Sequence, residues 1–125
     1  TNWNPHWAKP YVVNADEELV DRIAGDDMVR GNTISAVGFY GPQGRQVRLE
    51  LANPDLNRLI EQFEYRGRRI TNYEMESAPL AGMGRLMGHR CMTVCSIIAN
   101  RFNTEANPNY KSGIKDLIAT VLERI

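Results

Sequence analysis

The sequence lacks the features that mark several large classes of protein. Its 125 residues contain no apolar run near the roughly 20 residues that cross a membrane. The first residues show no basic segment followed by an apolar core, so we expect no signal peptide and a cytoplasmic location. Neither sign of charge is in excess, with fifteen basic and fifteen acidic residues. This balance argues against nucleic acid and membrane surfaces as partners, because proteins that bind them by bulk charge usually carry a basic excess.

Cysteine and histidine are scarce, with two of each. On a strand, Cys91 and Cys95 would lie about 13 Å apart, at roughly 3.3 Å per residue, which is too far for a disulfide bond. We therefore expect two reduced thiols, as is usual in the cytosol. The cysteines also lack the partners that a zinc site needs, because His6 and His89 stand alone in their neighbourhoods, and no metal site is predicted.

The sequence does contain apolar segments whose spacing alternates between that of strands and that of helices. Hydrophobic residues make up 42% of the chain, enough for one compact domain. Periodicity and turn residues predict strands at 33–40, 70–75 and 91–100 and a short extended piece at 47–51. They also predict helices at 16–24, 54–63, 76–87 and 113–125, the first of them capped by Asn14 or Asp16. The last strand is apolar on both faces, as a central parallel strand is. Alternating strands and helices favour an α/β fold with right-handed crossovers.

Polar and charged residues follow each of the three predicted strands. They lie at 39–45, 72–77 and 97–101. Ligands of open parallel sheets collect at the carboxyl ends of the strands. The sequence therefore predicts a cleft for a small molecule at that edge of the sheet.

The most specific pattern is the run Asn-Tyr-Glu-Met-Glu-Ser-Ala at 72–78. It closely resembles the N-(Y/F)-E-M-E-(S/T/A)-A signature of the nucleoside phosphorylase family, whose members include uridine phosphorylases. The resemblance extends upstream through Gly-Phe-Tyr-Gly-Pro-Gln-Gly-Arg at 38–45 and downstream from Gly88 to Arg101. Three segments in the right order, across nearly the whole chain, make the resemblance specific.

The resemblance implies a fold and a reaction. The fold would be the C-terminal half of the family's three-layer α/β fold, a mostly parallel or mixed sheet flanked by helices. Residues 1–125 would form one partial domain, with an irregular lead-in at 1–13. The reaction would be the reversible phosphorolysis of uridine to uracil and ribose 1-phosphate, with phosphate as a co-substrate and no cofactor.

Three residues match the family's contacts to the base. Gln43 and Arg45 match the Gln-x-Arg pair that binds the uracil edge in uridine phosphorylases. Uracil presents a carbonyl, an N–H and a carbonyl; a Gln amide offers both a donor and an acceptor, whereas Arg offers only donors. Phe39 matches an aromatic residue that stacks on the base. Without the resemblance, the same residues would be interpreted as a turn Gln, a surface Arg and a core Phe.

Two further residues match contacts to the ribose. Glu76 matches the carboxylate that accepts hydrogen bonds from the ribose hydroxyls, and an ionised Glu is an acceptor only. Met75 matches a residue that packs on the sugar. The alternative for Glu76 is a carboxylate favoured by the dipole at a helix N-terminus. Because side chains alternate along a strand, Glu74 should point away from Glu76 or lie in a layer behind it. We expect the Glu74 carboxylate to have a structural role or to be linked to an ion.

The third segment favours pyrimidines over purines. Purine-specific relatives place Ser-Asp where this chain has Ile98 and Ala99. Without that Asp, the resemblance implies an apolar wall in which Ile98 contacts the base. Arg101 matches an Arg that supports the Gln side chain or reaches a uracil carbonyl, and the loop at 102–112 matches a mobile flap. A purine nucleoside phosphorylase or a nucleosidase is the less favoured alternative.

The family's phosphate site has no counterpart in the sequence. Its glycine and arginines lie in the first half of full members, and no Gly-Asp-Pro-x-Arg-like run occurs here. The chain also lacks an initiator Met, which indicates a processed, truncated or tagged form. We therefore expect the isolated chain to be inactive and to need the missing N-terminal half or other copies of itself, as in a homo-oligomer. The alternative from another class is a non-catalytic binding or assembly module.

Overall fold

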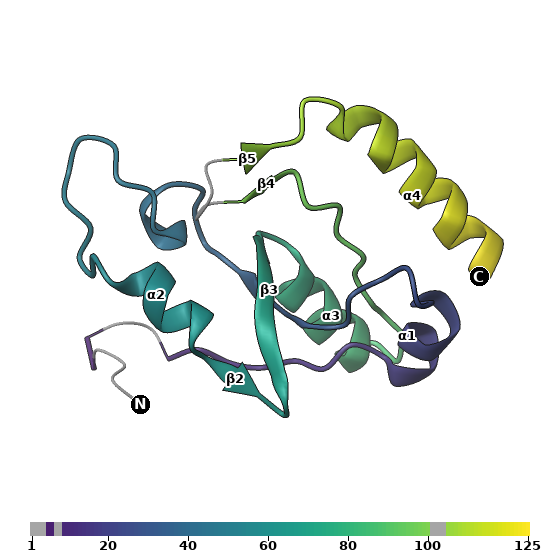
Figure 1. The fold of residues 1–125 in the computed structure, drawn as a ribbon. Helices are drawn as coiled ribbons and strands as arrows, with labels where there is room; N and C mark the ends of the chain where they lie inside the picture. The colour runs from purple at the N-terminus through teal and green to yellow at the C-terminus, as the bar shows by residue number, and fades with distance from the viewer. Residues whose placement is uncertain (1–4, 7–8, 101–104) are drawn as a thin grey trace.

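A small mixed sheet forms the centre of the fold (Figure 1). The computed structural model describes residues 5–6, 9–100 and 105–125. β1 (Asn32–Ser35) pairs in parallel with β3 (Arg68–Glu74), and β3 also pairs antiparallel with the short β2 (Glu64–Tyr65). The strand order is therefore β1-β3-β2, with β3 in the middle. This mixed sheet with flanking helices is the α/β arrangement that the sequence predicted.

Four α-helices lie at or near the predicted positions in the described part of the chain. They are α1 (Glu17–Ile23), α2 (Leu56–Glu61), α3 (Ser77–Leu86) and α4 (Tyr110–Arg124). α1 begins after Asp16, whose side chain accepts a hydrogen bond from the Leu19 N–H at 3.0 Å. α2 begins at Leu56, later than predicted, because the Asn53 side chain accepts from the Asp55 N–H at 3.0 Å and closes a turn before the helix. Among these helices, none is both long and apolar enough to cross a membrane.

β1 is shorter than predicted. The sequence predicted a strand over 33–40, but the strand ends at Ser35. The chain then bends, and a Cβ atom on Gly38 would lie 3.0 Å from Pro42 Cγ. Beyond Ser35 the chain therefore folds back into a 3-10 turn, η1 (Gly41–Gln43), instead of continuing the strand.

Two other predicted extended segments differ from the structure. Residues 91–98 form no strand, although their apolar pattern predicted the central parallel strand. An apolar run indicates burial, but a strand also needs a neighbouring backbone, and no described strand pairs with this segment. Its side chains are half-buried or exposed. Residues 47–51 begin with bends and form no strand either.

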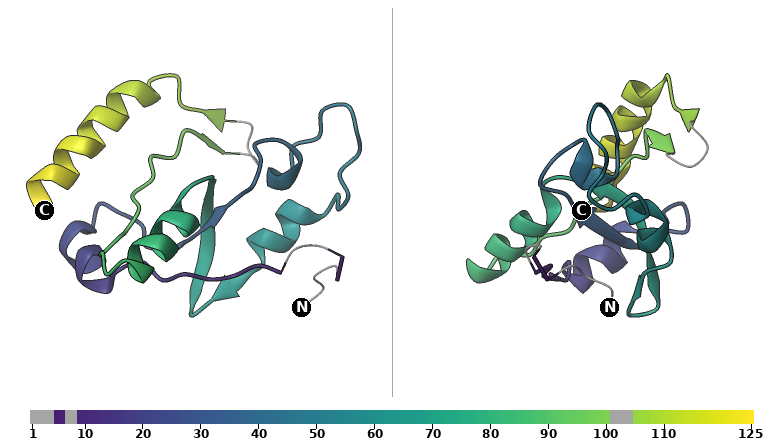
Figure 2. Two further views of the ribbon diagram at one scale, coloured as in Figure 1. Left: turned by 180° about the vertical axis from the view of Figure 1, so that it is seen from behind. Right: turned by 90° about the vertical axis from the view of Figure 1, so that its left-hand side faces the viewer.

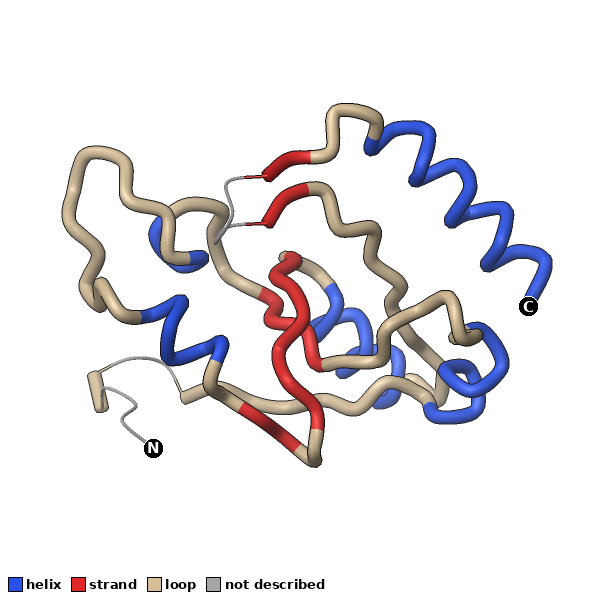
Figure 3. Tube along the Cα trace, in the orientation of Figure 1, coloured by secondary structure: helices blue, strands red, loops and turns tan. Residues whose placement is uncertain are grey.

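A second, separate strand pair follows that segment. β4 (Ala99–Asn100) pairs antiparallel with β5 (Glu105–Ala106), so the region predicted as a loop contains one strand and the start of α4. Figure 3 shows a long loop leading into β4, and Figure 2 shows α4 standing away from the three-stranded sheet. The central sheet instead contacts α3 through β1 and α2 through β3.

Few apolar side chains are buried. Among the described residues, Ile23 and Ala36 are the buried hydrophobic ones, whereas Leu80, Met83 and Leu86 on α3 are each more than half exposed. A broad hollow of about 2580 Å³ borders the sheet. A small-molecule pocket usually has roughly 300–1,000 Å³, so this hollow, which loops and helices line together with the sheet, is open surface and not a ligand-shaped cavity. A sheet with such a surface needs a further layer to bury it.

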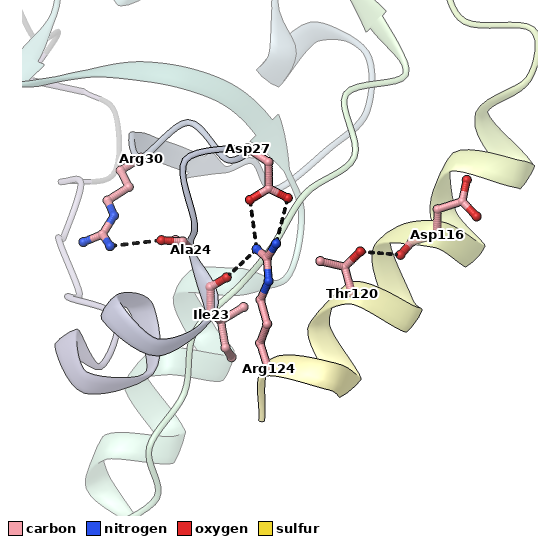
Figure 4. Close-up of polar contacts among 7 residues, drawn as sticks. All are labelled: Ile23, Ala24, Asp27, Arg30, Asp116, Thr120 and Arg124. Carbon is pink, nitrogen blue, oxygen red and sulfur yellow. Dashed lines mark hydrogen bonds and ion pairs between the residues drawn. The ribbon is translucent and has the colours of Figure 1, made fainter.

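Arg124 ties the end of α4 to the segment after α1 (Figure 4). Its Nη1 and Nη2 atoms donate to the two carboxylate oxygens of Asp27 at 2.9 and 3.0 Å, and Nη1 also donates to the Ile23 carbonyl at 2.9 Å. The hydrogen bond from Arg124 holds the pKa of the Asp27 carboxyl below its usual range. The pair therefore stays ionised at neutral pH and anchors α4 beside α1, the helix that it contacts.

Candidate functional site

The carboxyl ends of β1 and β3 lie side by side. The two strands are parallel, and their register pairs Ser35 with Glu74 at those ends. The predicted base-binding residues follow β1, and the predicted ribose-binding residues follow β3. Two of the three predicted polar segments therefore start from one edge of the sheet, which is where open parallel sheets bind ligands.

Arg45 joins the three predicted base contacts into one cluster. Its Nη1 donates to Gln43 Oε1 at 2.8 Å and also to the Phe39 carbonyl oxygen. Its guanidinium carbon lies 3.8 Å from the centroid of the Phe39 ring, a cation–π contact. The turn fixes this arrangement, because the backbone N–H groups of Gln43 and Arg45 both donate to the Tyr40 carbonyl at 3.0 Å. Phe39, Gln43 and Arg45 are thus in direct contact.

The members of this cluster differ in accessibility. Gln43 is 4% exposed and Phe39 is 52% exposed. A buried amide needs hydrogen-bond partners, and Arg45 supplies a donor to the Gln43 oxygen. Phe39 is therefore partly accessible to a planar ligand, although Arg45 lies over one face of its ring, whereas hydrogen bonding to Gln43 requires its amide to become accessible first.

Glu74 holds the start of α3. Its Oε2 accepts hydrogen bonds from the N–H groups of Glu76 and Ser77 at 2.6 and 2.5 Å, and its Oε1 accepts one from the Ser35 hydroxyl. The same hydroxyl accepts from the Ala78 N–H at 2.7 Å. The carboxylate thereby ties α3 to β1 and fixes the backbone at Glu76. This is the structural role that we expected for Glu74.

The pKa of the Glu74 carboxyl reflects these contacts. Burial raises it, but the hydrogen bonds from Ser35, Glu76 and Ser77 together outweigh burial, so the pKa lies below its ordinary value. A carboxyl with a lowered pKa in the folded state stabilises the fold fully above its unfolded pKa, about 4.3 for Glu. That contribution is lost as the pH falls through the folded pKa, so we expect it to be intact at neutral pH and to disappear only in acid.

Replacing Glu74 with Ala is expected to destabilise the chain by about 1–2 kcal/mol, because the first N–H groups of α3 lose their acceptor. Urea unfolding at neutral pH measures this loss. Glu74→Gln keeps one acceptor oxygen and should recover part of it. The difference in unfolding free energy between the unchanged chain and Glu74→Ala should become smaller as the pH falls below the ordinary carboxyl pKa. A difference that does not depend on pH would contradict the assigned role.

Met75 and Glu76 lie at the N-terminus of α3. Met75 is 38% exposed, and Glu76 is also exposed. The Glu76 carboxylate accepts a hydrogen bond from the Met75 N–H at 3.2 Å. The helix dipole stabilises a carboxylate here, and its exposed oxygens can accept hydrogen bonds from a ligand at the same time. The ribose-binding and helix-end interpretations are therefore compatible.

The third predicted segment lies on the β4–β5 pair. Ile98 directly precedes β4, is 49% exposed, and accepts a backbone hydrogen bond from the Asn107 N–H at 2.9 Å. Arg101 and part of the predicted flap, residues 102–104, lie outside the described residues. The described part of the flap is β5, the turn after it and the start of α4.

One further contact was not predicted from the sequence. The Tyr73 hydroxyl donates to Asn57 Oδ1 at 2.9 Å, and Asn57 Nδ2 donates to the Gly44 carbonyl at 3.3 Å. Asn57 lies on α2, outside every motif of the resemblance. The only sequence signal nearby is Gly44 itself, because a Gly in a Pro-Gln-Gly turn suggests a positive φ. Gly44 indeed has a φ of 69°.

Comparison with known proteins agrees with the resemblance. The sequence model of the phosphorylase superfamily matches residues 3–124. A uridine phosphorylase of Thermococcus kodakarensis is 33% identical over 101 residues, covering 76% of this chain and 32% of that protein. This chain thus spans about a third of the length of that curated relative.

A solved structure shows the same fold. The crystal structure of a Trypanosoma brucei nucleoside phosphorylase, described as showing uridine phosphorylase activity, matches with a TM-score of 0.78 at 22% identity. The match covers 90% of this chain and 42% of that one. The strands and helices described above are therefore arranged as in part of a nucleoside phosphorylase fold.

Proposed function

Since this chain belongs to the phosphorylase superfamily, we propose that it forms the base- and ribose-binding part of an enzyme that reversibly converts uridine and phosphate to uracil and ribose 1-phosphate. Such an enzyme is a pentosyltransferase of pyrimidine salvage. In this proposal residues 1–125 are one partial domain. The phosphate site lies outside them, in an N-terminal half or in another copy within a homo-oligomer.

The observation that carries the proposal is the contact of Arg45 with both Phe39 and Gln43. This cluster combines an aromatic face with the amide and guanidinium groups that suit the uracil edge. When the glycosidic bond breaks, negative charge develops on the departing base, and preorganised donors stabilise it. Arg45 and the Gln43 amide are the donors that we assign to this task, while Phe39 stacks on the base.

The other side of the ligand is assigned to the segment after β3 and to the β4–β5 pair. We assign Glu76 to the ribose hydroxyls and Met75 to packing on the sugar. Ile98 would form an apolar wall beside the pyrimidine, and Arg101 would support the base contacts. A purine enzyme is disfavoured because Ile98 and Ala99 stand where an acid would protonate a purine nitrogen.

The proposal is tested by titrating the ¹⁵N-labelled chain with uracil, uridine and adenosine. Uracil and uridine should shift the backbone signals of residues 39–45, uridine should also shift those of 75–77, and adenosine should bind more weakly. Because Gln43 is buried, its side-chain NH₂ signals should move on uracil binding. The chain alone should show no phosphate-dependent turnover of uridine. Preferred binding of adenosine, or no response to uracil, would overturn the proposal.

A second candidate function is favoured by the burial of Gln43. Its amide oxygen already accepts from Arg45, so the pair could serve only to hold the η1 turn. The chain would then be a non-catalytic binding or assembly module with the family fold. In that case uracil would leave the signals of residues 39–45 unchanged, and the same titration separates the two functions.

A further inference from the structure

Asn57 connects the base cluster with the strand that leads to the ribose segment. It lies on α2, is half-buried, and makes two side-chain hydrogen bonds. One is accepted from the Tyr73 hydroxyl at 2.9 Å, two residues before Met75 on the chain. The other is donated to the carbonyl of Gly44 at 3.3 Å, and Gly44 is the residue between Gln43 and Arg45.

The orientation of the Asn57 amide follows from its partners. The Gly44 carbonyl can only accept, so the group facing it has to be the NH₂ of Asn57. The amide oxygen then faces the Tyr73 hydroxyl, which can donate to it. Each end of the amide thus has a partner of the right kind, and rotating the amide by half a turn would place two acceptors against each other at Gly44.

The backbone conformation of Gly44 and its lack of a side chain allow this contact. Its φ of 69° lies in the left-handed region, where glycine carries no penalty. A Cβ atom at this position would lie 2.5 Å from Asn57 Nδ2. A larger residue at position 44 would therefore be strained and would push Asn57 away. The contact between the turn and the Asn57 side chain therefore requires glycine at position 44.

We propose that Asn57 and Tyr73 are positioning residues that set the placement of Gln43 and Arg45 relative to the segment after β3. The inference rests on the proposed function, because the ligand that needs this placement is a pyrimidine nucleoside. Uracil and its ribose must be held at once by two segments that are far apart in the sequence. The Tyr73–Asn57–Gly44 bridge is a side-chain link between them, in addition to the pairing of β1 with β3.

Two near-isosteric variants each break one half of the bridge. Asn57→Asp keeps the acceptor for Tyr73 but places an oxygen against the Gly44 carbonyl, and Tyr73→Phe removes only the hydroxyl. Each variant should weaken uracil binding by about three- to tenfold, as expected for loss of one hydrogen bond. Cytosine, which carries the opposite donors and acceptors at N3 and C4, should bind with little change. The preference for uracil over cytosine should therefore fall.

A merely structural role predicts a different result. Arg58→Gln, on the next position of α2 and exposed, is the matched control and should leave the preference unchanged. In the ligand-free chain, Tyr73→Phe should also shift the backbone amide signals of Gly44 and Arg45. Unchanged signals and an unchanged preference in both variants would overturn the inference. If the unchanged chain itself fails to bind uracil, the proposed function fails instead.

Discussion

Gln43→Ala is expected to weaken uracil binding by about 10- to 100-fold, the largest loss for any single change in the base cluster. A Gln amide offers uracil both a donor and an acceptor. Removing it leaves polar groups of the bound base without partners in a desolvated site, which costs about 1–3 kcal/mol. Each 1.4 kcal/mol is about a factor of ten in affinity. Isothermal titration or NMR titration with uracil measures the change.

The effect on the fold must be separated from the effect on the ligand. Gln43 accepts a hydrogen bond from Arg45, so Gln43→Ala should also cost some stability, and its unfolding curve has to be recorded at the temperature of the titration. Gln46→Ala is the matched control, because Gln46 lies on the same loop but is exposed. Equal uracil affinity for both variants would show that Gln43 serves the turn alone.

The sequence predicted the helices better than the strands. α1, α3 and α4 have local signals, such as the Asp16 cap and the apolar spacing of the last helix, and local signals decide where a helix begins. The segment 91–98 has the apolar pattern of a central strand, yet no described strand pairs with it. Strand pairing depends on a second backbone that periodicity cannot reveal.

The same difference between local signals and tertiary contacts applies to the candidate site. The resemblance selected Phe39, Gln43 and Arg45, and the structure shows that they contact one another, although their roles toward a ligand stay predictions. The sequence could not have shown that Arg45 covers one face of Phe39 or that Gln43 is buried, because both depend on how the η1 turn closes. The role of Asn57 could not be predicted for a related reason. An Asn on a helix can serve many purposes, and only the tertiary contact with Gly44 shows which one applies here.

Glu76→Gln is expected to reduce the affinity for uridine by about 10- to 100-fold while leaving that for uracil unchanged. A carboxylate accepts hydrogen bonds from both vicinal ribose hydroxyls, and bonds to a charged group contribute about 1.5–3 kcal/mol. The Gln amide keeps the shape but has one acceptor oxygen and no charge. Uracil has no ribose, so its binding should be indifferent to the change. Parallel titrations with the two ligands measure the difference.

Comparing Glu76 with two other carboxylates makes this result specific. Glu17 lies, like Glu76, at the start of a helix and is exposed, so Glu17→Gln reproduces the loss of a favourable dipole interaction without touching the site. Glu74, two residues before Glu76, accepts from backbone N–H groups, so its replacement should lower stability and affect both ligands alike. If Glu76→Gln behaves like Glu17→Gln, its carboxylate belongs to the helix and not to the ribose. A loss of affinity for uridine without a loss for uracil, seen in Glu76→Gln alone, assigns the sugar to the segment after β3, because only a contact with ribose separates the two ligands.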